Sequence, residues 1–189
     1  FNVLLEASRG GHLEIARLAI SQGISPNSQS RHAGETPLTV AATNGHKELA
    51  RYLLEIGADP NWQTKSGDTA LMLAAERGHY EVIKILLEHQ ANILLQNLKG
   101  KTALKVASES NRTEVIKLLS SKSGVVNIAD SDQETPLMTL VRHNNLAAVK
   151  VVLKAGAIVG KKNVNGQTAI DLAKILKRDQ EIVKKLSES

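Results

Sequence analysis

The feature that most constrains this chain is a short motif that returns every 33 residues. The motif begins with a threonine, which is followed by Pro or Ala and then by Leu or Ile. Its threonines are Thr36, Thr69, Thr102, Thr135 and Thr168. A fixed period of about 20 to 50 residues is typical of proteins built from stacked repeats. We therefore expect an array of one small structural unit, in which each copy is packed against its neighbours.

Each period predicts two helices. Thr36 is placed to cap a helix with its hydroxyl, and Pro37 suits the first helical position because no N–H is needed there. The helix over residues 38–44 should end at Gly45, since glycine readily adopts the left-handed conformation of a helix stop. A second helix is predicted over residues 47–57, where the apolar positions form one stripe. Those positions are Leu49, Ala50, Leu53 and Leu54.

The rest of the period, ADPNWQTKSGD, is rich in turn residues and predicts an extended hairpin-like loop, which we call a finger. Two segments of the chain resemble ankyrin repeats: TPLTVAATNGHKELARYLLEIGADPN and TALMLAAERGHYEVIKILLEHQAN. The resemblance implies an all-α ankyrin-repeat solenoid of stacked helix-turn-helix units joined by hairpin-like fingers. It covers the whole chain and implies a single domain, 1–189. Its parts are a partial first repeat at 1–34, full repeats from 35, 68, 101 and 134, and a truncated C-terminal capping repeat at 167–189.

Two departures from the repeat pattern carry predictions. The first finger, SQSRHAGE, is offset by 34 residues from the next repeat and should hold one extra residue. The turn glycine found at Gly45 is replaced later by Asn111, Asn144 and Lys177. Asparagine tolerates a left-handed turn, whereas Lys177 fits it poorly.

Composition limits the classes of protein to consider. With 42% hydrophobic and 23% charged residues, the chain has no apolar run near the ~20 residues of a membrane span. The absence of cysteine fits a reducing compartment, so we expect a cytoplasmic, monomeric protein. Since the sequence lacks an initiator methionine, we expect it to be part of a longer protein.

No residue pattern indicates catalysis, a metal site or a cofactor. His12, His46 and His79 return at one repeat position, which favours a structural role in bracing the turn between helices over a ligand role. No HExxH motif, phosphate-binding glycine loop or Gly-x-Ser-x-Gly elbow is present. We therefore predict that the chain is not an enzyme and binds no cofactor.

Charge is concentrated in the second half. Residues 1–100 carry nine Lys and Arg against ten Asp and Glu, whereas residues 101–189 carry fifteen against nine. Lysine pairs such as Lys161-Lys162 could attract nucleic acid, but only 2% of residues are aromatic and no nucleic-acid module is recognisable. A solvated basic face is the favoured interpretation.

The resemblance implies a protein–protein interaction scaffold that binds a partner protein or peptide through a concave surface of fingers and inner helices. The alternative is a targeting or regulatory arm of a larger enzyme or bacterial effector. We expected the candidate contact residues to be dispensable for the core. On the fingers they are Trp62, Gln63, Lys65, Ser66, Asp68, Gln96, Leu98, Lys99, Lys101, Ser131 and Asp132. At the ends of the first helices they are Glu76, Arg77, Glu109, Ser110, Arg142 and His143.

Arg77, Leu98 and Trp62 are the expected anchors, because arginine and tryptophan dominate interface energetics when buried. Trp62 also belongs to a row with Leu95 and Ile128, spaced by 33 residues at the bases of the fingers. Two interpretations of this row stand: the side chains pack between fingers, or they form an exposed apolar strip for a partner.

Overall fold

The computed structural model describes residues 2–189, which form two compact units, one ending at Leu98 and the other beginning at Lys99. Unit 1 contains α1 (Val3–Gly10), α2 (Leu13–Ser21), α3 (Pro37–Asn44), α4 (Lys47–Glu55), α5 (Ala70–Arg77) and α6 (Tyr80–Glu88). Unit 2 contains α7 (Ala103–Glu109), α8 (Thr113–Ser120), α9 (Pro136–Arg142), α10 (Leu146–Lys154), α11 (Ala169–Ile175) and α12 (Gln180–Ser187). Residues 2–189 contain no strand. The predicted all-α repeat fold is confirmed.

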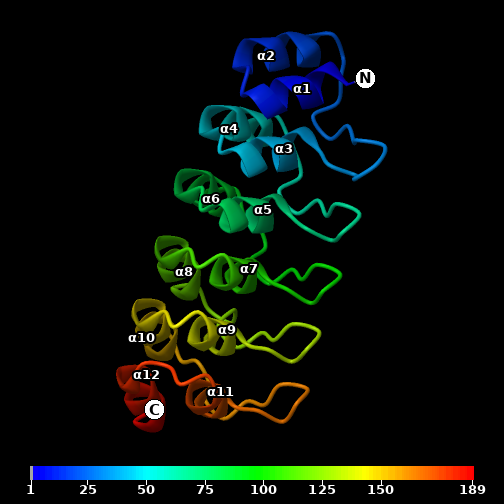
Figure 1. Ribbon diagram of the computed structural model, residues 1–189. Helices are drawn as coiled ribbons and strands as arrows, with labels where there is room; N and C mark the ends of the chain where they lie inside the picture. The colour runs from blue at the N-terminus through cyan, green and yellow to red at the C-terminus, as the bar shows by residue number, and fades with distance from the viewer. Residues whose placement is uncertain (1) are drawn as a thin grey trace. The chain divides into compact units, whose positions relative to one another are not determined.

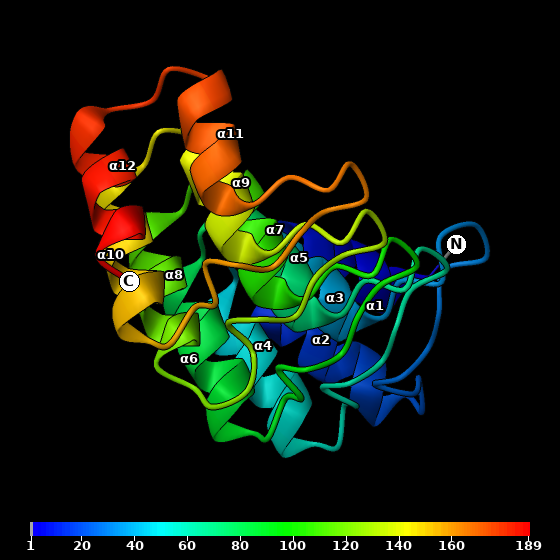
Figure 2. The same cartoon turned by 90° about the horizontal axis from the view of Figure 1, so that it is seen from below.

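Within each unit the helices form two rows. The odd-numbered helices pack side by side and are called inner helices, because the fingers extend from them (Figures 1 and 2). The even-numbered helices pack against one another on the opposite side and are called outer helices. The fingers are the loops at 22–36, 56–69, 89–102, 121–135 and 155–168. The arrangement of all 189 residues as a single domain stays a prediction.

Every inner helix from α3 to α11 begins at one of the repeated threonines. The hydroxyl of Thr36 accepts the backbone N–H of Thr39 at 3.3 Å, and the same bond recurs at Thr69, Thr102, Thr135 and Thr168. At Thr168 the bond is reciprocal, because Asp171 accepts the backbone N–H of Thr168 at 2.9 Å. That backbone bond, assisted by the Thr168 hydroxyl, holds the pKa of the Asp171 carboxyl below its ordinary value.

The outer helices bury the predicted stripe. Leu49, Ala50, Leu53 and Leu54 of α4 are all buried, between α3 on one side and the outer helices α2 and α6. Burying a leucine side chain contributes roughly 1.5–3 kcal/mol, so one repeat gains most of its stability from these few positions. Because an isolated pair of short helices could not bury this stripe, each repeat depends on its neighbours.

The fingers are closed by their own backbone bonds. In the second finger the N–H of Thr64 donates to Asp68 O at 3.0 Å. In the first finger the corresponding bond joins Ser30 N to Glu35 O at 2.8 Å and encloses one residue more. The predicted extra residue is therefore confirmed.

The turn that ends each inner helix is left-handed in all five later repeats. Gly45 and Gly78 have φ of 77° and 82°, and Asn111 and Asn144 have φ of 55°. Lys177, which was predicted to fit this turn poorly, also adopts it, with φ of 49°. The repeat architecture therefore imposes this conformation whatever residue is present, and the strain falls on the lysine.

Replacing Lys177 by glycine should stabilise the protein. Lys177 is exposed, so Lys177→Gly removes little besides the strain of the left-handed turn, and we expect roughly 1 kcal/mol more stability in urea denaturation. Lys177→Ala keeps the Cβ atom and should give no comparable gain. Equal stability of the glycine variant and the unmodified protein would contradict this account of the turn.

Candidate protein-binding surface

The fingers are held in register by one backbone hydrogen bond per neighbouring pair. In unit 1, Lys65 N donates to Ala33 O at 2.9 Å and Leu98 N donates to Ser66 O at 3.0 Å. In unit 2, Ser131 N donates to Lys99 O at 3.1 Å and Val164 N donates to Asp132 O at 3.0 Å. Since the donors follow the 33-residue period, each finger presents its tip residues from the same backbone position.

Asparagine side chains add a second set of links between fingers. Asn27 and Asn127 each bridge to the next finger, donating to the carbonyl of Gly57 or Gly156 and accepting a backbone N–H. Asn61 accepts the N–H of Asn92 at 2.7 Å. The fingers within each unit are thus a braced surface, and side chains on it are held on a well-ordered backbone.

In unit 1 the expected contact residues differ in their exposure and in whether their side chains already form hydrogen bonds within the protein. Leu98 is 77% exposed, and Arg77 is exposed at the end of α5. Lys65, although exposed, donates from Nζ to Arg31 O at 2.7 Å. Gln63 donates to the carbonyls of Gly67 and Gln96. The remaining members are exposed or half-buried: Trp62, Ser66, Asp68, Glu76 and Gln96.

The row at the bases of the fingers is half-buried at all three positions, Trp62, Leu95 and Ile128. Trp62 donates from Nε1 to Gly34 O at 2.8 Å, which ties it to the preceding finger. A tryptophan whose only polar atom is used in this way is oriented by the fingers themselves. This geometry favours packing between fingers over a fully exposed strip.

In unit 2 one expected contact residue, Glu109, contacts a buried lysine that the sequence analysis did not single out. Lys105 of α7 is 1% exposed, and its Nζ lies 3.1 Å from Asp130 Oδ2 and donates to the Thr139 hydroxyl. Glu109 and Glu134 each place a carboxylate oxygen 3.7 Å from the same nitrogen. A lysine is buried only when partners of opposite charge surround it, and here three carboxylates do so.

Two further cations complete this ion network. Lys101 lies 2.7 Å from Glu109, and Arg142 contacts Glu134 through Nε at 2.9 Å and Nη2 at 2.5 Å. Three cations therefore face three carboxylates. Three residues expected to be dispensable for the core take part in this network: Glu109 is one of the carboxylates around Lys105, Lys101 pairs with Glu109, and Arg142 pairs with Glu134. That the core tolerates their loss stays a prediction.

The other members of the predicted set in unit 2 lie on the fingers or cap the inner helices. Lys99, Ser131, Asp132 and His143 are exposed, and Ser110 is half-buried. Ser110 and His143 are the capping residues of α7 and α9. One signal in the sequence pointed to the network: Lys105 stands where neighbouring repeats have Thr39, Met72 and Met138, all of which are buried.

The repeated histidines connect successive repeats. His46 Nε2 lies 3.0 Å from Arg9 O, and His79 Nε2 lies 3.0 Å from Thr43 O. The structural role expected for them is confirmed at these two positions, although each ring braces the preceding repeat and not only its own turn. Over residues 2–189 there is no cluster of three or more His, Cys, Asp or Glu that could hold a metal ion.

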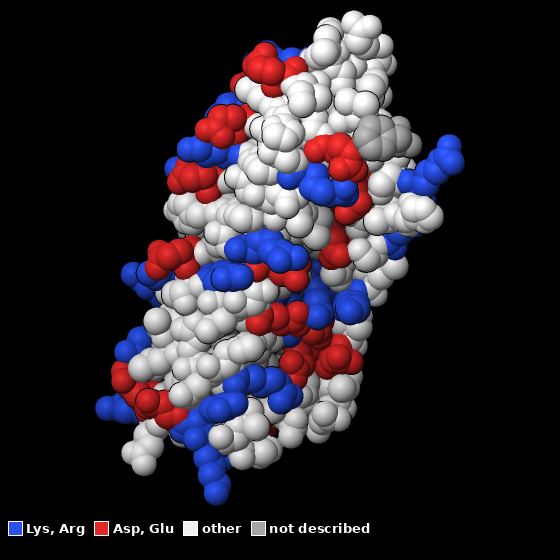
Figure 3. Space-filling view, turned by 45° about the horizontal axis from the view of Figure 1, so that its top comes forward, with Lys and Arg blue, Asp and Glu red and all other residues white. Residues whose placement is uncertain are grey.

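Charges of both signs are interspersed on the face shown in Figure 3. No extended basic surface dominates that face, which is consistent with a solvated surface and gives no support to a nucleic-acid groove. None of the helices in residues 2–189 is long and apolar enough to cross a bilayer.

Paired short helices, threonine caps, braced fingers and a 33-residue period together define a helical-repeat protein. The family model described as ankyrin repeats (3 copies) matches residues 1–64 and 56–130. The chain belongs to the ankyrin-repeat family, as the sequence analysis predicted, and ankyrin repeats are protein-interaction modules.

A search of curated protein sequences finds no match. Among solved structures, the chain is similar to one chain of a complex between the predatory endopeptidase Bd0816 from Bdellovibrio bacteriovorus and the immunity protein Bd3460. The TM-score is 0.87 at 28% identity, and the alignment covers 100% of this chain and 98% of that one.

Proposed function

We propose that this protein binds a partner protein through the surface formed by its fingers and the adjoining ends of its inner helices. The observation that carries the proposal is Leu98, a large apolar side chain that is 77% exposed on a finger whose backbone is bonded to Ser66. Because the backbone is already ordered, burying such a side chain against a partner loses little conformational entropy. Nearby positions of the same surface, such as Arg77, supply a residue type enriched in interface hot spots.

The partner surface in unit 2 has a different chemistry. Lys101 is already paired with Glu109, and Arg142 with Glu134, within the network around Lys105. When a partner buries these charged side chains, they lose their contacts with water, and only a partner that offers equivalent ion pairs compensates that cost. These residues therefore contribute more to the choice of partner than to the affinity for it. We infer that unit 1 supplies the apolar anchor and unit 2 the discriminating polar contacts.

An enzyme is the partner class that the structural comparison favours. The similar chain is part of a complex between an endopeptidase and an immunity protein, and the similarity extends over nearly the full length of both chains. We infer that this chain acts by binding, and that restraint of a partner enzyme is a candidate outcome of that binding. The alternative function, a regulatory arm of a larger protein, would use the same surface.

The combined variant Lys65→Ala/Arg77→Ala/Leu98→Ala should lose at least about tenfold in partner affinity, since hot-spot side chains each contribute roughly 2 kcal/mol or more. Partners are captured from a lysate of the source organism, and affinities are then measured by calorimetry with the purified partner. The matched control is Lys47→Ala/Tyr80→Ala/Lys84→Ala on the outer helices. Like the finger variant, it removes two cations and one large side chain, which here is a tyrosine instead of a leucine.

The control variant should bind as the unmodified protein does, and both variants should keep the helical circular-dichroism spectrum. Loss of binding in the outer-helix variant alone would contradict the assignment of the surface. Identification of an enzyme among the captured proteins, with its activity lowered by the unmodified chain but not by the finger variant, would support restraint of an enzyme.

A further inference from the structure

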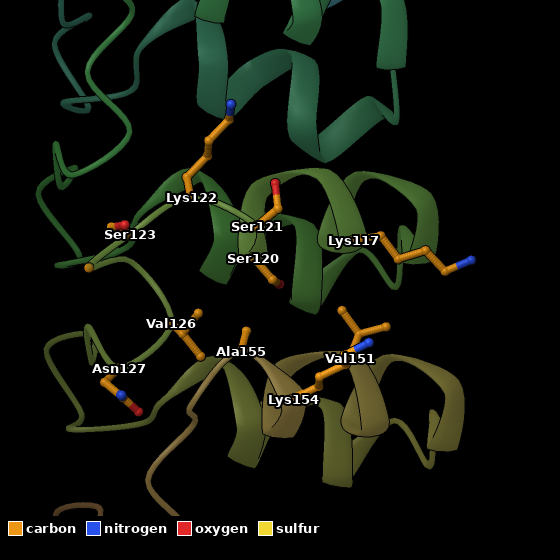
Figure 4. A pocket seen from close by; sticks show the side chains of 11 residues that line it. Lys117, Ser120, Ser121, Lys122, Ser123, Val126, Asn127, Val151, Lys154 and Ala155 are labelled. Carbon is orange, nitrogen blue, oxygen red and sulfur yellow. The ribbon is translucent and has the colours of Figure 1, made fainter.

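A groove of about 470 Å³ opens between α8 and α10 on the outer row of unit 2. Ser120 points into it from the end of α8 and Val151 from α10, and Val126 and Ala155, the residue that follows α10, lie between the two repeats (Figure 4). Its lining comes from α8, α10 and the starts of the fingers at 121–135 and 155–168, and it includes none of the contact residues proposed above. Volumes of this order are typical of sites that accept a ligand group or a peptide side chain.

The groove exists because two facing positions carry unusually small side chains. At the position of Ser120, the other repeats have Leu54, Leu87 and Leu153. At the position of Ala155, they have Ile56, His89 and Lys122. Protein interiors are normally filled by interdigitating side chains, and here the leucine-sized volume between two neighbouring outer helices is left open.

The lining decides which chemistry fits. Val126 is buried, and the hydroxyls of Ser120 and Ser121 already donate to the carbonyls of Ile116 and Leu118, at 2.6 Å and 2.7 Å. These hydroxyls are therefore occupied as donors, which disfavours a phosphate-binding site. An aliphatic side chain, by contrast, needs no donor and would replace the missing leucine.

The rim of the groove is basic. Lys117, Lys122 and Lys154 belong to it, and none of the described residues that line it is acidic. Lys117 pairs with Glu114 at 2.6 Å, but both side chains are largely exposed, so that pair is weak and easily exchanged. Unit 2 as a whole carries sixteen Lys and Arg against nine Asp and Glu, which attracts acidic segments over a distance.

We propose that this groove is a second docking site, which binds an acidic peptide segment of a partner protein. One aliphatic side chain of the segment inserts between Ser120 and Ala155, and flanking carboxylates pair with Lys117 and Lys154. The site uses none of the contact residues proposed for the first partner, so the protein can hold that partner and, in the groove, an acidic segment at the same time.

The test is an NMR titration of the ¹⁵N-labelled protein with the peptide acetyl-Glu-Asp-Leu-Glu-Asp-amide. We expect shifts confined to the amides around Ser120–Gly124 and Val151–Ala155, and binding that weakens as salt is added. A peptide with Ser in place of Leu, and one with Lys in place of each acidic residue, should each bind at least about tenfold more weakly.

Two variants fill the groove from opposite sides. Ser120→Leu and, separately, Ala155→Leu should each weaken peptide binding by about tenfold or more while leaving the melting temperature unchanged or higher. Ser21→Leu, which adds the same side chain to α2 in unit 1, is the matched control and should bind normally. Using both filling variants keeps the test valid if one of them fails to fold.

The proposal is overturned if the acidic peptide produces no localised shifts, or if both filling variants bind it as well as the unmodified protein does. It is also overturned if the serine peptide binds equally well, because insertion of an aliphatic side chain would then be excluded. Inorganic phosphate that reproduces the same shifts at the same concentration would reassign the groove as an anion site.

Discussion

Asp130→Asn should destabilise the protein by about 3 kcal/mol, because it leaves the ammonium group of Lys105 buried without its closest carboxylate. Asp130 Oδ2 lies 3.1 Å from Lys105 Nζ, and both residues are buried. The substitution is mild in shape, since Oδ1 can still accept the backbone N–H groups of Asp132 and Glu134. The loss would be read as a shift of the urea unfolding midpoint followed by circular dichroism.

Removing the lysine should be far less harmful than removing its partner. In Lys105→Met, Asp130 keeps two backbone donors, Glu109 keeps Lys101 and Glu134 keeps Arg142. Methionine also occupies the same position in neighbouring repeats, at Met72 and Met138. We expect a change within about 1 kcal/mol for this variant, and a recovery of most of the lost stability when it is combined with Asp130→Asn.

If Asp130→Asn proved as stable as the unmodified protein, the ion network would not be a structural requirement of unit 2. If Lys105→Met were the more damaging variant, the carboxylates would be the groups that depend on the lysine. Comparing the stabilities of the two variants therefore tests whether the lysine depends on the carboxylates more than the carboxylates depend on the lysine.

Gly67→Ala is expected to cost about 3 kcal/mol and Gly57→Ala only about 1 kcal/mol, although both glycines are left-handed. Gly67 has φ of 80° and Gly57 has φ of 91°. A Cβ atom on Gly67 would lie 2.7 Å from Leu98 N and 2.9 Å from Asn97 Cα, which are backbone atoms of the next finger. A Cβ atom on Gly57 would meet nothing within 4 Å.

Comparing these two variants separates the cost of backbone strain from the cost of a clash between two closely packed fingers. Alanine at Gly67 must push the next finger away and break the bond from Leu98 N to Ser66 O, whereas alanine at Gly57 carries only the strain. Urea unfolding followed by the fluorescence of Trp62, the single tryptophan and a residue of unit 1, measures both. Equal losses for the two variants would show that the fingers are not tightly packed at this point.

Gly67→Ala should also lower partner affinity if the finger surface is the binding surface, since Leu98 would no longer be held in place. Gly57→Ala should leave affinity unchanged. Partner affinity is a readout separate from stability. It would be measured without urea, at a temperature where both variants are fully folded.

Much of the local architecture follows from the sequence alone. The threonine caps, the left-handed turns and the buried stripe of α4 depend on residues a few positions apart, so a 33-residue period contains all the information needed. Even the longer first finger is evident from the offset of 34, because one inserted residue must be accommodated in a loop. These features repeat because the same short-range bonds repeat.

Only the tertiary structure decided how the exposed positions are used. The network around Lys105 joins α7, α9 and the finger that precedes α9. The groove between α8 and α10 arises from Ser120 and Ala155, which belong to successive repeats. A repeat pattern predicts that such positions are variable, but it does not specify which of them meet. Pairing of charges and opening of a cavity depend on side chains about one repeat apart that approach only when the repeats stack, and stacking is a property of the folded chain.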